Sequence, residues 1–112
     1  MNQKVRFDAQ SPSAWWFLAR RANYQVPRMA SAAGIGVPQL RRCCRKFWGE
    51  SLEVWLRDQR LLAARQLLAE GSPVKKTASR LGFKSSTHFA RIFRETFGCS
   101  PREHARRFAE QR

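Results

Sequence analysis

Val26-Pro27-Arg28-Met29-Ala30-Ser31-Ala32-Ala33-Gly34 occurs a second time, in modified form, as Val74-Lys75-Lys76-Thr77-Ala78-Ser79-Arg80-Leu81-Gly82. The shared pattern is V-x-[KR]-x-A-S-x-x-G, and the two valines are 48 positions apart. Each copy is followed by a second shared pattern. Leu40-x-Arg42-x-Cys44-Arg45 corresponds to Phe89-x-Arg91-x-Phe93-Arg94, now 49 residues apart, so the second copy contains one additional residue. The chain is therefore internally duplicated.

Each copy reads as a short helix, a glycine turn and a basic amphipathic helix, which is the pattern of a helix-turn-helix unit. Helical periodicity and end signals predict an all-α fold and no alternating strand pattern is present. The predicted helices are 12–22, 27–33, 38–47, 51–70, 74–81, 85–97 and 101–109. We expect seven helices in a homeodomain-like arrangement, with two helix-turn-helix subdomains joined by a long linker helix.

The predicted organisation has four parts. Residues 1–11 form a flexible N-terminus, 12–50 the first helix-turn-helix subdomain, 51–70 the linker helix and 71–112 the second subdomain. Ser11-Pro12 and Ser100-Pro101 are favourable helix starts, because serine caps the helix and proline suits its first turn. The helix expected from Pro38 has Gly36 or Val37 at its cap position, so we expect a weaker start there.

The net charge of the chain indicates which kinds of partner it can bind. The 112 residues contain 22 Lys and Arg against 8 Asp and Glu, a net charge of +14. Most of the excess is arginine, whose planar fork suits phosphates and guanine edges, so nucleic acid is the favoured partner. An acidic protein or an anionic membrane can also attract such a charge. No run is long and apolar enough for a membrane span, and the N-terminus lacks a signal-peptide core, so we expect a cytoplasmic protein that does not bind membranes.

Side chains with catalytic or metal-binding potential do not form a recognisable set. Three cysteines do not suggest a disulfide framework, and Cys43 and Cys44 are expected to pack as small apolar residues on the buried stripe of their helix. We find no supported Ser/His/Asp or Cys/His pairing, no carboxylate pair and no phosphate-cradling glycine loop. The prediction is a protein that is not an enzyme and needs no cofactor or metal.

The two basic amphipathic helices carry the candidate DNA contacts. In each, an apolar stripe is expected to face the domain, while residues near the start of the helix face outward to base edges. The buried stripes are Leu40, Cys43, Cys44 and Phe47 in the first helix, and Phe89, Ile92, Phe93 and Phe97 in the second. The predicted base contacts are Pro38, Gln39, Arg41, Arg42, Ser86, Thr87, Ala90 and Arg91, and the predicted phosphate contacts are Arg45, Lys46, Lys84, His88 and Arg94.

Individual side chains suit this chemistry. Arg91 can donate two hydrogen bonds to guanine, Gln39 can pair with adenine, and Thr87 and Ala90 can meet a thymine methyl. Arg42 and Arg91 occupy the same place in the two copies. Other arginines, such as Arg106, are as well explained by surface pairs or phosphate contacts.

The second half also resembles a known family. The run Ala78-x-x-x-Gly82-Phe83-x-x-x-x-x-Phe89-x-Arg91-x-Phe93-Arg94-x-x-x-Gly98-x-Ser100-Pro101 is similar to the signature of the AraC/XylS transcription regulators, and Arg60-Leu61-x-x-Ala64-Arg65-x-Leu67-Leu68 resembles their linker helix. The resemblance covers about 13–108. The chain resembles short stand-alone members of that family, or a fragment of a longer one. Gly36, Cys44 and Thr77 depart from the family pattern, at positions where a capping serine, a large aromatic and an aliphatic residue are usual.

The function expected from the residues and the resemblance is sequence-specific transcription regulation. The resemblance implies two helix-turn-helix units that read adjacent major-groove segments of double-stranded DNA, as a monomer, and RNA polymerase as a further partner. Two alternatives remain open. One is a non-specific nucleic-acid-binding protein that uses the same charge, and the other is a degenerate family member that acts through protein-protein interaction.

Overall fold

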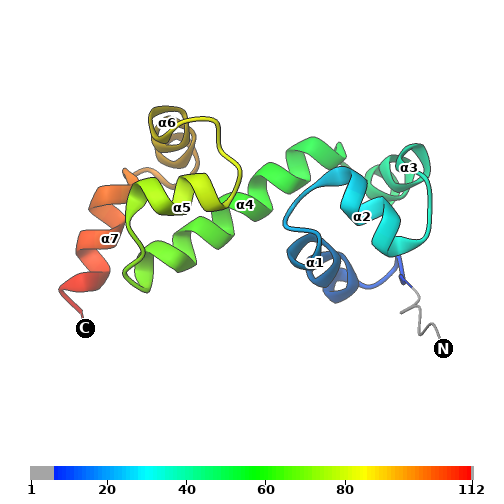
Figure 1. The fold of residues 1–112 in the computed structure, drawn as a ribbon, viewed down its shortest axis with the longest axis horizontal. Coiled ribbons are helices and arrows are strands. Elements are labelled where there is room, and N and C mark those ends of the chain that lie inside the picture. Colours follow the sequence, from blue (N-terminus) through cyan, green and yellow to red (C-terminus); the bar gives the residue numbers. More distant parts are fainter. Residues whose placement is uncertain (1–6, 112) are drawn as a thin grey trace. The chain divides into compact units, whose positions relative to one another are not determined.

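The computed structural model describes residues 7–111, so residues 1–6 of the predicted flexible N-terminus and Arg112 lie outside the described residues. The described part is all-α, with seven helices and no strand, as the sequence predicts (Figure 1). The helices are α1 (Pro12–Arg21), α2 (Val26–Ala33), α3 (Val37–Trp48), α4 (Leu52–Ala69), α5 (Val74–Arg80), α6 (Ser86–Phe97) and α7 (Pro101–Ala109). In the described residues, no helix is both long and apolar enough to cross a membrane.

The chain divides into two compact units, and the boundary between Gln59 and Arg60 falls inside α4. The first unit contains α1, α2, α3 and the first half of α4. The second contains the rest of α4 and α5, α6 and α7. Each unit thus has one candidate recognition helix, α3 or α6.

The core of the first unit is aromatic. The Trp15 ring, on α1, is fully buried and lies edge-on to Trp55 of α4, with ring centroids 5.6 Å apart. Trp15 also stacks on Phe47 of α3 at 6.4 Å, and its indole nitrogen donates a hydrogen bond to the Ala9 carbonyl oxygen at 3.1 Å. Edge-to-face and stacked rings stabilise a core beyond their buried area alone. These contacts fix α3 against α1 and α4.

Short polar signals set the ends of the helices in this unit. The Ser11 hydroxyl accepts a hydrogen bond from the backbone nitrogen of Ala14, as expected for the cap of α1. Gly34 ends α2 at φ 73°, a left-handed conformation that glycine adopts without steric cost. The reversal between α1 and α2 uses Asn23 and Tyr24, which also have positive φ, a feature that the sequence analysis did not foresee.

The second unit has a phenylalanine core. Phe89 and Phe93 of α6 are fully buried, with ring centroids 5.7 Å apart. His104 of α7 is buried beside Phe93, and its Nε2 lies 3.2 Å from the Arg65 carbonyl oxygen. The Arg65 guanidinium lies over the Phe97 ring at 4.8 Å. The burial of His104 was not predicted, because its partner is 39 residues away in sequence.

Thr77 shows how a departure from the family pattern is accommodated. Its side chain is fully buried on α5. The hydroxyl oxygen lies 2.8 Å from the Pro73 carbonyl oxygen and 2.9 Å from the Ser72 hydroxyl oxygen. Donating to the carbonyl leaves the oxygen free to accept from Ser72, so the buried polar group is satisfied and its burial penalty is offset.

Two of the predicted buried stripes are narrower than expected. On α3, Leu40 and Cys44 are buried but Cys43 and Phe47 are half-buried. Adjacent helical residues point about 100° apart, so the core that covers Cys44 does not cover Cys43. The prediction that both cysteines pack in the core was therefore wrong for Cys43. On α6, the half-buried members are Ile92 and Phe97.

Candidate nucleic-acid interface

The predicted contact residues of the first unit lie on α3 and share one side of it. Residues 38, 41, 42 and 45 have the i, i+3, i+4, i+7 spacing of a single helix face. All six side chains assigned to DNA are exposed, while Leu40 and Cys44 bury the opposite side: Pro38, Gln39, Arg41, Arg42, Arg45 and Lys46. The face offered to solvent is therefore basic.

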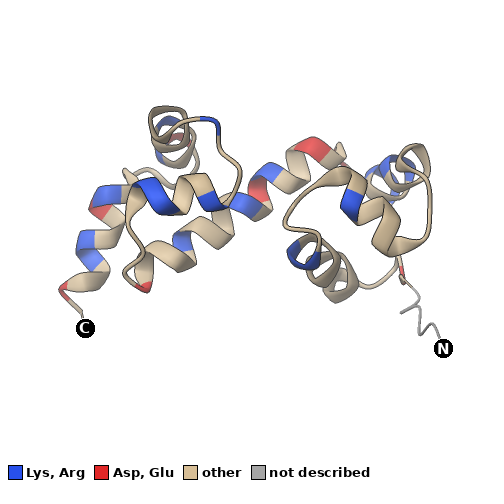
Figure 2. Cartoon of the chain, viewed as in Figure 1, with Lys and Arg blue, Asp and Glu red and all other residues tan. Residues whose placement is uncertain are grey.

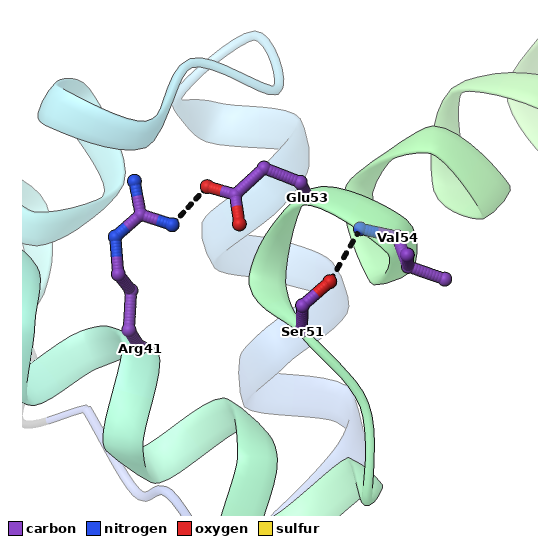
Figure 3. Close-up of polar contacts among 4 residues, drawn as sticks. All are labelled: Arg41, Ser51, Glu53 and Val54. Carbon is purple, nitrogen blue, oxygen red and sulfur yellow. Dashed lines mark hydrogen bonds and ion pairs between the residues drawn. The ribbon is translucent and has the colours of Figure 1, made fainter.

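Arg41 is not a free cation on this face. Its guanidinium donates a hydrogen bond to the Glu53 carboxylate, which lies in the first turn of α4 (Figure 3). The Ser51 hydroxyl caps the same helix start by accepting from the backbone nitrogen of Val54 at 3.2 Å. The hydrogen bond from Arg41 lowers the pKa of the Glu53 carboxyl below its ordinary value. The side chains of Arg41 and Glu53 are 46% and 56% exposed, so further donors of the guanidinium remain accessible.

The second unit offers a comparable face on α6. Residues 87, 90, 91 and 94 again have the spacing of one helix face. Thr87, Arg91 and Arg94 are exposed, whereas Ser86 and Ala90 are half-buried, and Lys84 is exposed just before the helix. One Arg91 terminal nitrogen lies 3.2 Å from His88 Nδ1, and the other lies 3.7 Å from a Glu95 carboxylate oxygen. These loose intrahelical contacts keep the guanidinium near the helix without burying it.

The two candidate recognition helices begin differently. The Ser85 hydroxyl accepts a hydrogen bond from the His88 backbone nitrogen at 3.0 Å and caps α6. Gly36 is the cap residue of α3, in extended conformation, and it provides no side-chain hydrogen bond. Gly36 is one of the two cap positions expected from the sequence, and the backbone nitrogens of the first turn of α3 lack the side-chain acceptor that Ser85 supplies to α6.

Of the basic residues beside the start of α6, the sequence analysis named Lys84 but missed Lys75, Lys76 and Arg80. A hollow of about 620 Å³ is lined by residues of α5, the turn and the first residue of α6, including Lys75, Lys76, Ser79, Arg80, Lys84 and Ser85. Figure 2 shows α5 as one of the basic segments of the chain. The signal was present in the sequence, because Lys76 and Arg28 are the shared basic position of the two repeats. Such a hollow suits a phosphate group, which backbone nitrogens and lysines at a helix start can hold.

The remaining chemistry of the described residues is limited. No group of three or more His, Cys, Asp or Glu in this part of the chain can hold a metal ion. Burial, followed by the negative charges of Glu50 and Glu53, raises the pKa of the Cys44 thiol to about 11. Cys44 is therefore a neutral thiol near pH 7, which agrees with its expected packing role.

Comparisons with known proteins place this geometry in a family. Residues 29–107 match the family model described as a helix-turn-helix domain. The transcriptional activator NphR of Rhodococcus sp. is 36% identical over 90 residues, which cover 76% of this chain and 27% of NphR. The virulence regulon transcriptional activator VirF of Yersinia enterocolitica is 29% identical over 79 residues, 70% of this chain and 29% of VirF. The chain thus spans less than a third of the length of either relative.

Among solved structures, the chain is similar to the DNA-binding domain of AdpA, a global transcriptional factor, in complex with a target DNA. The TM-score is 0.70 at 27% identity, and the likeness covers 94% of this chain and 96% of that one. The residues that match the family model include both α3 and α6. The chain belongs to the AraC-type helix-turn-helix family of DNA-binding transcription regulators.

Proposed function

We propose that this protein is a sequence-specific transcription regulator in which α3 and α6 each read one major-groove segment of the same duplex. The observation that carries the proposal is the matched pair of basic faces, each on the side of a helix opposite a buried stripe. Helices of this kind enter the major groove and contact base edges near their N-termini. The protein acts as a monomer in this proposal, because one chain supplies both helices.

The proposed base contacts are Pro38, Gln39, Arg41 and Arg42 on α3, and Ser86, Thr87, Ala90 and Arg91 on α6. Arg42 and Arg91 are the principal readers, since both are exposed and hold equivalent places in the repeat. The guanidinium of each can donate two hydrogen bonds to one guanine. Arg45, Lys46, Lys84, His88 and Arg94 contact phosphates, and the hollow lined by Lys75 and Lys76 holds a further phosphate.

The sign of regulation is proposed from the relatives. NphR and VirF are both named as transcriptional activators. We propose that this chain likewise activates transcription, in the cytoplasm and together with RNA polymerase. A reporter gene placed downstream of a DNA site that the chain binds should gain expression when the chain is supplied. A fall in expression would show repression instead.

The decisive experiment is selection of bound duplexes from a random pool with the purified chain, at about 0.15 M salt, where distant exposed charges are largely screened. We expect two enriched sequence blocks whose centres lie about 10 base pairs apart, one turn of the duplex. Non-specific binding through charge predicts steep salt dependence and no enriched sequence. Recovery of a pool as random as the starting one would therefore refute the proposal in favour of that alternative.

A further inference from the structure

An aromatic and basic face of α1 is unused by the core and by the candidate DNA contacts. Trp16 and Phe17 are 49% and 59% exposed, the two highest values among the large exposed hydrophobic side chains of the described residues. Together with Ser13, Arg20 and Arg21 they line a hollow of about 630 Å³. Residues 13, 16, 17 and 20 have the spacing of one helix face. We call Trp16, Phe17, Arg20 and Arg21 the α1 face.

The fold does not require these aromatic residues. Trp15, Leu18 and Ala19 already bury the opposite side of α1. Trp16 stacks on Trp48 with ring centroids 6.5 Å apart, which orients its ring but leaves half of the side chain in solvent. At exposed helix positions, Ala, Lys or Glu favours the helix more than Trp or Phe does. Adjacent exposed aromatic side chains beside a hollow are a feature of interaction sites.

The position of this face separates it from the base-reading residues. Trp48, the neighbour of Trp16, is the last residue of α3, whereas the predicted base contacts begin at Pro38. Ten residues of helix span about 15 Å at 1.5 Å per residue. The α1 face is therefore built at the end of α3 that does not carry the first base contacts.

The charge of the α1 face indicates which kind of partner can bind there. The α1 sequence contains no acidic residue and ends in Arg20 and Arg21, both of which are exposed. Against a second copy of the chain, this face would bring four guanidinium groups together, on molecules of net charge +14. Like charges that are brought close together repel. An acidic partner instead neutralises the arginines while its apolar side chains cover the two rings.

We propose that the α1 face docks an acidic amphipathic segment of a partner protein. Apolar side chains of that segment pack against Trp16 and Phe17, and its carboxylates pair with Arg20 and Arg21. Amphipathic segments commonly bind hydrophobic hollows through such apolar anchors. Because docking leaves the proposed base contacts of α3 uncovered in this proposal, partner and DNA bind at the same time.

The test uses a labelled synthetic peptide of about 16 residues. Leu and Phe stand at helical spacing on one side of the peptide, and Glu and Asp occupy the other side. Its binding to the whole chain is followed by fluorescence anisotropy. The first variant is Trp16→Ser with Phe17→Ser, and the second is Arg20→Glu with Arg21→Glu. The matched control is Arg106→Glu with Arg107→Glu, because the last turn of α7 also contains two adjacent exposed arginines and the change in net charge is identical.

We expect each α1 variant to weaken peptide binding at least tenfold, against less than threefold for the α7 control. A peptide with the same acidic residues and Ser in place of Leu and Phe should bind all the proteins weakly. DNA binding by the Trp16→Ser, Phe17→Ser variant should stay within twofold of the parent, which also shows that the variant is folded.

Four results would overturn the proposal. The first is no binding of the acidic amphipathic peptide to the parent chain at millimolar concentration. The second is an equal loss in the α7 control, which would mean attraction by net charge alone. The third is a loss of DNA affinity in the Trp16→Ser, Phe17→Ser variant, which would make this a DNA surface. The fourth is Trp16-dependent binding to anionic phosphatidylserine vesicles, or Trp16-dependent dimerisation in sedimentation, with no Trp16-dependent peptide binding.

Discussion

Replacing Glu53 with Gln tests how α3 uses Arg41. The carboxylate accepts a hydrogen bond from the guanidinium, and the two side chains are 46% and 56% exposed. Ion pairs this exposed contribute about 0.2–1 kcal/mol. We therefore expect Glu53→Gln to lower the free energy of unfolding by less than about 1 kcal/mol, which leaves the chain folded for DNA measurements.

The larger effect is expected on DNA. The substitution removes a negative charge beside α3 and weakens the hold on the Arg41 donors that Glu53 occupies, which on random DNA can then contact a phosphate. One added phosphate contact steepens the dependence of log affinity on log salt by about 0.9. Across a fourfold change in salt, a slope of 0.9 corresponds to roughly 3.5-fold in affinity. We expect the affinity of the variant for random duplexes, relative to the parent, to rise by about that factor when the salt is lowered fourfold, and its preference for the selected site to fall.

The assay is anisotropy titration of a labelled selected duplex and a labelled random duplex at several salt concentrations. Glu70→Gln is the matched control, because it removes the same charge just beyond the other end of α4, where Glu70 accepts a hydrogen bond from Gln66. The same change is then made in an Arg41→Ala background. If Glu53→Gln steepens the slope equally with and without Arg41, or if Glu70→Gln reproduces the effect, the reasoning about this ion pair is refuted.

The ion pair also predicts a pH dependence. The Arg41 hydrogen bond lowers the pKa of Glu53 in the folded state, so the pair stabilises the chain at pH values above the ordinary carboxyl pKa of 4.5. That contribution is lost as the pH falls from 4.5 through the lowered folded-state pKa. The stability difference between parent and Glu53→Gln, measured by denaturant unfolding, should accordingly shrink at acid pH. A difference that is constant from pH 7 to below the folded-state pKa would contradict this sign.

The remaining predictions concern the helix caps, the core and the buried thiol. Ser85→Ala should lower the free energy of unfolding by about 1 kcal/mol through loss of the α6 cap, and Gly36→Ser should raise it by roughly a few tenths of a kcal/mol. Both changes are measured by denaturant titration. A Ser85→Ala variant that is as stable as the parent would mean that the cap is not formed. Phe93→Ala should cost about 3–5 kcal/mol because the ring is fully buried, and an unchanged thermal midpoint would contradict its place in the core. At pH 8 the Cys44 thiol should be alkylated far more slowly than Cys99, since a pKa of about 11 leaves little thiolate, and equal rates by tandem mass spectrometry would show that Cys44 is accessible.

Local signals made most of the fold predictable. Ser11, Ser85 and Ser100 each cap the helix that follows, and Gly34 and Gly98 end the helices before them, all from interactions within a few residues. Residue types alone carry such information because capping and left-handed turns depend on short-range sterics and hydrogen bonds. The periodicity of the apolar stripes likewise identified which helices have a buried side.

Features that depend on distant partners were not predictable. The hydrogen bond of Arg41 requires Glu53 of the next helix, and the burial of His104 requires the carbonyl oxygen of Arg65. Periodicity also cannot say how far a core extends around a helix, which is why Cys43 was misplaced. Within the candidate site, the exposed basic residues of α3 and α6 were predictable, but the hollow beside α5 was not, because it forms where two helices meet.

The most direct test of the proposed dual readout is a base-by-base substitution map of the selected duplex, measured with the parent, Arg42→Ala and Arg91→Ala. We expect each variant to lose about 1–3 kcal/mol of discrimination at its own base pair, and the two base pairs to lie about one turn apart. A uniform loss of affinity for every sequence in both variants would show that neither arginine reads a base. Loss at one shared base pair would show that the two helices do not read separate segments.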